Sequence, residues 1–343
     1  MLALALIALL LAPATAGAEI LLPPGFTAKV YVSGEGFDGT RAGSGIPSSS
    51  TLAFDPAGTL YLARSGRRYQ GGEVEDLWPI YRVPLGGGRV GKDVEARFLY
   101  GPPLPNPQVG IVRGAHDLLV TTFDRDRGLG VLYRIVDGRA DLVAGGTPPP
   151  GAPPLLKQPE GVALDGAGNL YVADRAQNVV VQLDPSGRLL DPRWLTVTRP
   201  RLVVGHGDRI WVSSDGDAEA PWQRGTGEIW SVGPEGRQLT LRGPIAFGMS
   251  ASPAGHLLVA DRQNAKLLAV GGDGTSTEFA TFSEGDAPRA VIFAPDTEAT
   301  RRAGIAGELF VILIRRGTFT LNEIVRVSGP FDSFVRSRLP ASR

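Results

Sequence analysis

The sequence predicts an all-β fold, a six-bladed β-propeller built from four-stranded antiparallel blades. A strand-like run of four residues recurs six times; the shortest interval is 40 residues, from Leu170 to Ile210, and the longest is 58, from Leu60 to Leu118. Each run is bounded by the Gly, Pro, Asp or Asn residues that tight turns require. Repeats of this length with about four strands each are typical of propeller blades. The six runs begin at Leu60, Leu118, Leu170, Ile210, Leu257 and Leu309.

The clearest unit covers residues 158–187. It begins with a strand at Gly161–Leu164, an Asp-x-x-Gly turn and a second strand at Leu170–Ala173. A polar loop leads to a third strand at Val179–Leu183, and the turn Asp184–Gly187 closes the unit. The spacing of turn residues therefore predicts three successive antiparallel strands.

The other five units follow the same order, with a weaker signal for the fourth strand. We expect fourth strands at Arg97–Tyr100 and Glu278–Thr281. The expected third strands are Ile80–Val83, Val131–Ile135, Glu228–Val232, Lys266–Val270 and Glu323–Val327.

A single blade cannot bury both of its faces, so the blades must stack in a closed ring. Thr27–Val32 is a strand-like segment before the first blade, and we expect it to supply the outer strand of the last one. The tail around Phe334 and Val335 is the competing candidate. Residues 19–343 would then form one domain, because all-β folds of this size often do.

The amino terminus has the pattern of a secretory signal peptide. Residues 2–12 are all Leu, Ala or Ile, and Ala16-Gly17-Ala18 offers small residues for cleavage before Glu19. The run is shorter than the roughly 20 residues that cross a bilayer. We therefore expect residues 1–18 to be removed and the protein to be periplasmic or secreted, without a membrane anchor.

The charge balance argues against a nucleic-acid partner, and the lack of cysteine excludes disulfides. The chain has 35 Lys plus Arg against 35 Asp plus Glu, and it has no Cys. A balanced chain has no long-range field to hold a phosphate backbone, so we expect no nucleic-acid partner. Disulfides are excluded.

The string from Pro159 to Asp174, Pro-Glu-Gly-Val-Ala-Leu-Asp-Gly-Ala-Gly-Asn-Leu-Tyr-Val-Ala-Asp, resembles an NHL repeat. The segments 22–31 and 307–311 resemble the ends of glucose/sorbosone dehydrogenase propellers, which are quinoproteins. The resemblance implies a six-bladed ring. It does not imply one activity, because such propellers include lyases, lactonases, dehydrogenases and binding modules.

In propellers, the entry to each innermost strand and the exit of each second strand lie on one face, here called the channel mouth. The entry position of Glu160 corresponds to Ser50, Val109, Arg201, Phe247 and Arg289. The exit position of Asp174 corresponds to Arg64, Thr122, Ser214, Asp261 and Leu313. The predicted ligand-binding residues are Glu160, Arg201, Arg289, Arg64, Asp174, Asp261 and Phe247, with Trp222 in a nearby loop.

Arginine forks beside an aromatic ring suit carboxylate, sugar or peptide ligands. Two other interpretations stay open. The charged residues could pair with one another and plug the channel, and Asp174 and Asp261 could satisfy backbone amides at the loop starts.

The histidines argue against the enzymes of the resembling families. His116, His206 and His256 all fall in the first turn of their blades, on the face opposite the mouth. The resembling dehydrogenases use a His just before the innermost strand, where this chain has Lys157–Glu160. Gluconolactonase-like enzymes hold a divalent ion with several ligands at the position of Glu160, where this ring has one carboxylate. We therefore predict no catalytic and no metal-binding residues.

The sequence favours an exported propeller that binds a small polar ligand or a protein partner through its channel mouth. The alternative is a sugar dehydrogenase-like or lactonase-like enzyme with a divergent site, in which Glu160 replaces the base. Only this alternative would call for pyrroloquinoline quinone or Ca²⁺, the latter at Asp174, Asp215 and Asp261. The cofactor is otherwise left unassigned.

Overall fold

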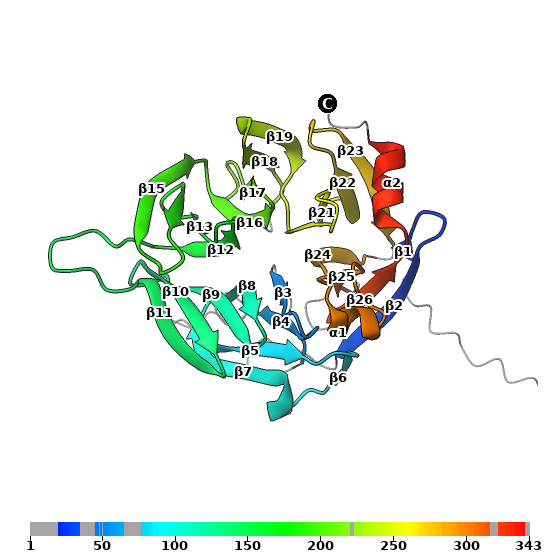
Figure 1. Ribbon diagram of the computed structural model, residues 1–343, viewed down its shortest axis with the longest axis horizontal. Helices are drawn as coiled ribbons and strands as arrows, with labels where there is room; N and C mark the ends of the chain where they lie inside the picture. Colours follow the sequence, from blue (N-terminus) through cyan, green and yellow to red (C-terminus); the bar gives the residue numbers. More distant parts are fainter. Residues whose placement is uncertain are drawn as a thin grey trace, which may run out of the picture.

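The computed structural model describes residues 20–34, 45–47, 49, 51–64, 77–219, 223–283, 285–315 and 322–339. Six sheets of mainly antiparallel strands stand around a central axis (Figure 1), which confirms the six-bladed propeller. The predicted signal peptide, residues 1–18, lies outside the described residues.

Each blade runs from an innermost strand at the axis to an outer strand at the rim. The first three blades are β3 (Leu52–Phe54), β4 (Leu60–Ala63), β5 (Leu77–Val83) and β7 (Leu99–Pro105); β8 (Gln108–Gly114), β9 (Asp117–Asp124), β10 (Leu129–Val136) and β11 (Arg139–Gly145); and β12 (Pro159–Leu164), β13 (Leu170–Asp174), β14 (Val179–Leu183) and β15 (Leu189–Thr196).

The other three are β16 (Pro200–His206), β17 (Arg209–Ser214), β18 (Thr226–Gly233) and β19 (Gly236–Pro244); β20 (Gly248–Ala251), β21 (Leu257–Asp261), β22 (Lys266–Val270) and β23 (Ser276–Phe282); and β24 (Ala287–Phe293), β25 (Leu309–Ile314) and β26 (Asn322–Ser328). The short strand β1 (Ile20–Leu21) pairs with β23 as a fifth strand.

The predicted second and third strands all fall within observed strands. One predicted fourth strand, Glu278–Thr281, lies inside β23. The other is wrong in its first half, because Ala96–Phe98 forms a 3-10 turn, η1, before β7 begins at Leu99. In that turn Phe98 is 2% exposed, so its burial is achieved without an extended backbone.

The ring closes through the amino terminus, as predicted. Strand β2 (Thr27–Gly34) pairs antiparallel with β26, and Val32 lies opposite Ile324. Strand β6 (Gly88–Val90), from the first blade's connection, adds to the outer edge of β2 in parallel. The competing segment at Phe334 and Val335 forms helix α2 (Phe331–Arg338) instead.

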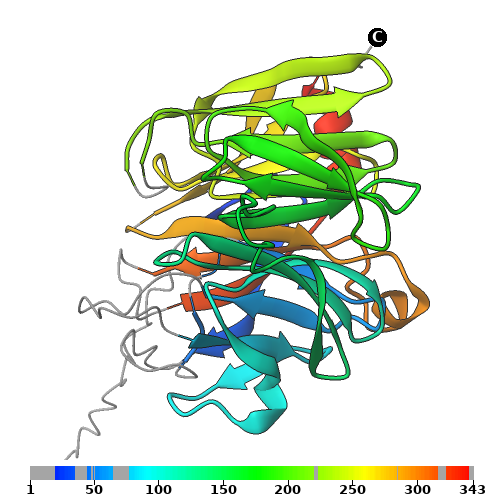
Figure 2. The same ribbon diagram turned by 90° about the vertical axis from the view of Figure 1, so that its left-hand side faces the viewer.

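The two faces of the ring differ. Helix α1 (Glu298–Arg302) connects β24 to β25 and marks the face of the first turns, at the lower right in Figure 2. The channel mouth is the opposite face.

Within the described part of the chain, α1 and α2 have 5 and 8 residues, and neither helix is long and apolar enough to cross a membrane.

Candidate functional site

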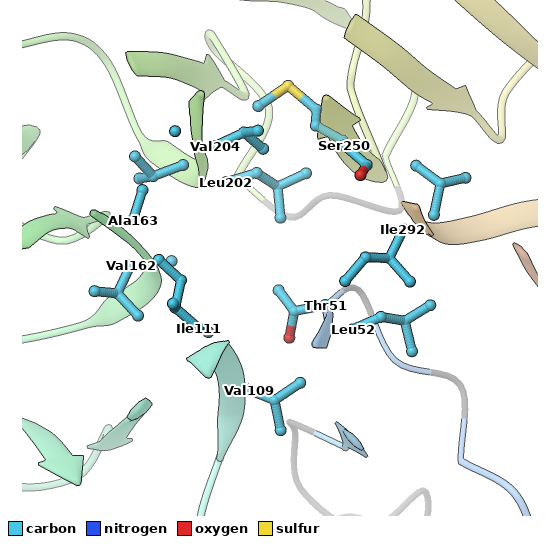
Figure 3. A pocket seen from close by; sticks show the side chains of 16 residues that line it. Thr51, Leu52, Val109, Ile111, Val162, Ala163, Leu202, Val204, Ser250 and Ile292 are labelled. Carbon is cyan, nitrogen blue, oxygen red and sulfur yellow. The ribbon is translucent and has the colours of Figure 1, made fainter. Parts of the chain in front are cut away.

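The six innermost strands surround an axial cavity of about 160 Å³ (Figure 3). Its wall is mostly apolar, and Thr51 and Ser250 are the lining side chains that carry a hydroxyl. Each innermost strand contributes at least one aliphatic or thioether side chain: Leu52, Val109, Val162, Leu202, Met249 and Ile292.

Charged side chains gather at the mouth end of this cavity. Glu160 and Arg201 directly precede the lining residues Gly161 and Leu202. Three further residues directly follow β13, β17 and β21, one precedes β20, and one lies in β24. We call the group the mouth cluster; it consists of Glu160, Arg175, Arg201, Asp215, Phe247, Arg262 and Arg289.

Asp215 is the centre of the ion pairs in the mouth cluster. Its Oδ1 lies 3.0 Å from Nε of Arg201, and its Oδ2 lies 2.7 Å from Nη1 of Arg175. The three side chains are 0%, 2% and 7% exposed for Asp215, Arg201 and Arg175. Two guanidinium groups thus compensate one buried carboxylate, which keeps the desolvation of Asp215 from being prohibitive.

Glu160 lies beside Asp215 and its two arginines, and its pKa is shifted upward. Its Oε1 accepts a hydrogen bond of 2.5 Å from Nε2 of Gln158 and lies 3.9 Å from Nε of Arg175. Burial raises the pKa of Glu160 above its ordinary value, and the carboxylate of Asp215 adds to this, while Arg175 and Arg201 act in the opposite direction. A carboxyl group with a raised pKa in a cleft is a candidate functional group.

Phe247 is enclosed by guanidinium groups. Its ring centroid lies 5.7 Å from Cζ of Arg201, 5.2 Å from that of Arg262 and 5.5 Å from that of Arg289. These distances are within the range of cation–π attraction. Because Phe247 is 1% exposed, its ring orients the arginines and offers no open surface for stacking a ligand.

One nitrogen of the Arg201 guanidinium group lacks an acceptor within the described part of the chain. Its Nε is bound to Asp215 and its Nη2 donates to the carbonyl of Ala246, but its buried Nη1 has no hydrogen-bond partner among the described residues. A buried unsatisfied donor on a charged group is costly. An acceptor for Nη1 would be favoured if it were negatively charged, because hydrogen bonds from a guanidinium group are strongest to anions.

Asp174 and Asp261 are not part of the mouth cluster. Asp174 accepts hydrogen bonds from the backbone N–H groups of Lys157, Gln158 and Gln177, and Asp261 accepts from the N–H and side-chain amide of Asn264. Both carboxylates therefore secure the loops of their own blades, which is the second interpretation that the sequence left open.

Arg64 is not part of the mouth cluster either. It belongs to the first blade, and its guanidinium lies 4.2 Å from the ring centroid of Trp78. The expected entry residue of the second blade is also displaced: two register shifts in β8 bring Val109 opposite Val120, level with Val162 inside the cavity. Ser50 and Trp222 lie outside the described residues.

Sequence reasoning missed Arg175 and Arg262, and considered Asp215 only as a metal ligand. The signal was present in the Ala-Asp-Arg triplets at 173–175 and 260–262. In each triplet the aspartate turns to its own loop and the next residue reaches the mouth. Alternation of side chains at a strand end accounts for this.

The mouth does not fit the metal sites that the family resemblance implies. Among the described residues, no three His, Cys, Asp or Glu side chains lie close enough together to hold a metal ion. The two carboxylates of the mouth cluster are engaged, Glu160 by Gln158 and Asp215 by two arginines, whereas Ca²⁺ needs several oxygen ligands. We therefore derive no chemical step through Ca²⁺ or through a quinone paired with it.

The histidines lie at the first turns, as predicted. His116 has a positive φ of 59° in a two-residue turn, and its Nδ1 lies 3.1 Å from the Tyr61 hydroxyl. His206 ends β16, and His256 precedes β21. These positions are at the ends of the innermost strands away from Glu160.

No protein-family model matches the sequence, and no curated protein matches it either. Solved structures do share its fold. The PQQ-bound aldose sugar dehydrogenase from Streptomyces coelicolor is 15% identical, with a TM-score of 0.56 over 90% of this chain and 100% of that one. A gluconolactonase from Xanthomonas campestris is 14% identical, with a TM-score of 0.56 over 90% and 99%.

The apo-form aldose sugar dehydrogenase from Escherichia coli is 13% identical, with a TM-score of 0.53 over 89% of this chain and 100% of that one. At these identities the likeness establishes the propeller and does not transfer an activity. The NHL resemblance stays a prediction.

Proposed function

We propose that the protein is an exported β-propeller that binds a small anionic molecule, such as a carboxylate, at its channel mouth. The apolar run at residues 2–12 supports export to the periplasm or the outside. Arg201 supports the ligand class, because a guanidinium donor that has no acceptor among the described residues binds an anion most strongly.

The observation that carries the proposal is the buried Nη1 of Arg201, which has no acceptor among the described residues. Asp215 fixes the guanidinium from the Nε side, and the carbonyl of Ala246 holds Nη2. The N–H bonds of Nη1 are thereby held in one direction, and because Arg201 is 2% exposed, a ligand would reach them through a local opening of the mouth. Preorientation lowers the entropy lost on binding.

An enzymatic role is the second candidate, and Glu160 is the observation that favours it. Its pKa is raised, chiefly by burial, so the group can exchange a proton closer to neutral pH than an exposed glutamate can. The dehydrogenase and lactonase activities of proteins with the same fold make sugars and lactones the substrates to test.

The test is titration calorimetry of the purified protein with acetate, hexanoate, gluconate and glucose. We expect the carboxylates to bind and glucose not to bind. Arg201→Met should weaken carboxylate binding by about tenfold or more, because a hydrogen bond to a charged group is lost. Arg289→Ala serves as a second variant, because Arg289 is only half-buried and its loss should leave the fold intact.

Arg242→Ala is the matched control, since Arg242 pairs with Glu228 on an outer strand. The proposal fails if no carboxylate binds, or if the Arg242 variant loses as much affinity as the Arg201 and Arg289 variants. Turnover of aldoses with dye, quinone and Ca²⁺, or of gluconolactone, that Glu160→Gln abolishes would favour the enzyme instead.

A further inference from the structure

The axial cavity begins where the mouth cluster ends. Glu160 and Gly161 are neighbours in β12, and Arg201 and Leu202 are neighbours in β16; the first of each pair belongs to the cluster and the second lines the cavity. Arg201 does not line the cavity itself, but its neighbour Leu202 does, so one end of the apolar space lies next to the backbone of Arg201.

The cavity offers few polar side-chain groups to a ligand. Oγ1 of Thr51 donates to Oε1 of Gln108 at 3.1 Å, and Oγ of Ser250 accepts from the N–H of Phe293 at 3.1 Å. Each hydroxyl group thus makes one hydrogen bond within the protein. Strand edges add main-chain groups to the wall, but apolar atoms make up most of its surface.

We infer that the ligand is a monocarboxylate with a straight aliphatic tail of about six carbons, with its head at Arg201 and its tail in the axial cavity. This inference rests on the proposed function and specifies its ligand. The cavity volume of about 160 Å³ sets the length, since an apolar cavity of about 150 Å³ accommodates a benzene molecule. The apolar wall excludes a polyhydroxylated chain, whose hydroxyl groups would be buried without partners.

Hexanoate and gluconate are the matched ligands for the test, because both have six carbons and one carboxylate. Titration calorimetry should show affinity rising about twofold to fourfold for each CH2 added from acetate to hexanoate, and levelling off beyond that length. Gluconate should bind no more tightly than acetate. Hexanol, which lacks the charge, should bind much more weakly than hexanoate.

Val204→Phe tests the location of the tail. Val204 lines the cavity and is only half-buried, so a larger side chain can fill the space without displacing a fully packed core. We expect this variant to bind hexanoate as weakly as acetate while its acetate affinity stays that of the wild type. Leu190→Phe, at an exposed position on β15, is the control and should leave the length dependence unchanged.

The outcomes separate the two proposals. Equal affinities for acetate, gluconate and hexanoate would overturn the tail assignment and leave the anion site standing. Retention of the length dependence in Val204→Phe would also overturn it. If hexanol binds as tightly as hexanoate, or if no carboxylate binds, the anion site itself is refuted, and the tail assignment with it.

Discussion

At the scale of single residues, the mouth is built from side chains with sharply different tasks. Asp174 and Asp261 bind backbone amides of their own loops, while the next residues, Arg175 and Arg262, join the mouth cluster. Asp215 neutralises two arginines, yet Nη1 of Arg201 is left without an acceptor among the described residues. Residue types alone therefore could not identify which charges are available to a ligand.

Glu160 predicts a pH dependence of stability. Its pKa is raised in the folded state, so between its unfolded pKa and its folded pKa the native protein binds more protons than the unfolded chain. The free energy of unfolding then falls as pH rises through that window. Glu160→Gln removes this loss, so the variant should gain stability relative to the wild type as the pH rises above the ordinary pKa of a glutamate, about 4.3.

Urea unfolding of both proteins at pH 4 and pH 7 measures this change. Glu235→Gln, at an exposed ion pair with Arg209, should show no such gain. A stability difference between Glu160→Gln and the wild type that is the same at both pH values would contradict the burial of an ionisable group at this position.

At the scale of elements, short-range sequence signals defined the strands well. The Asp-x-x-Gly turn and the alternating strands of residues 158–187 reappear as β12, β13 and β14. The signals failed where tertiary packing decides the conformation. In the 3-10 turn η1, Phe98 packs in a core cluster with residues of the last blade, and neither this turn nor the register shifts in β8 leave a distinct local pattern.

Helix α2 gives an element-scale prediction. Phe331 is 5% exposed, and its ring centroid lies 4.9 Å from that of Phe26, 5.2 Å from that of Phe279 and 5.1 Å from that of Phe293. Phe331→Ala should lower the free energy of unfolding by about 3 kcal/mol, as expected for removing a buried aromatic ring.

Phe334→Ala, one turn later in the same helix, is the matched control. Phe334 is only partly buried, so its replacement should cost clearly less. Equal losses in the two variants, measured by urea unfolding, would mean that the helix as a whole rather than the packing of Phe331 carries the stability.

At the scale of the whole molecule, the ring depends on close contact between neighbouring innermost strands. A Cβ at Gly161 would collide with the main-chain oxygen of Arg201, and one at Gly248 would lie 2.7 Å from Cα of Ala290. The absence of a side chain at these positions lets adjacent blades approach. The same approach brings the mouth residues of successive blades together.

Closure by β2 gives the prediction at this scale. A chain beginning at residue 35 lacks β2, which exposes the edge of β26 and removes the buried Val32. We expect this chain to aggregate, or to unfold at a much lower temperature than a chain beginning at residue 19, because unpaired strand edges associate.

Insertion of eight Gly/Ser residues after Gly151 is the control. Gly151 is exposed and lies between β11 and β12, and lengthening such a loop costs little. If the chain that begins at residue 35 stays monomeric with the melting temperature of the longer one, β2 does not hold the ring closed.

The sequence by itself determined the six-bladed ring, its closing strand and the face on which the histidines lie. These follow from local turn chemistry and from the repeat, both of which are written along the chain. Only the tertiary structure decided which charged residues meet at the mouth, and that the residues next to them in the innermost strands line an apolar cavity. Those facts depend on strand register and on the spacing between blades, because side chains from four different blades must converge on one axis.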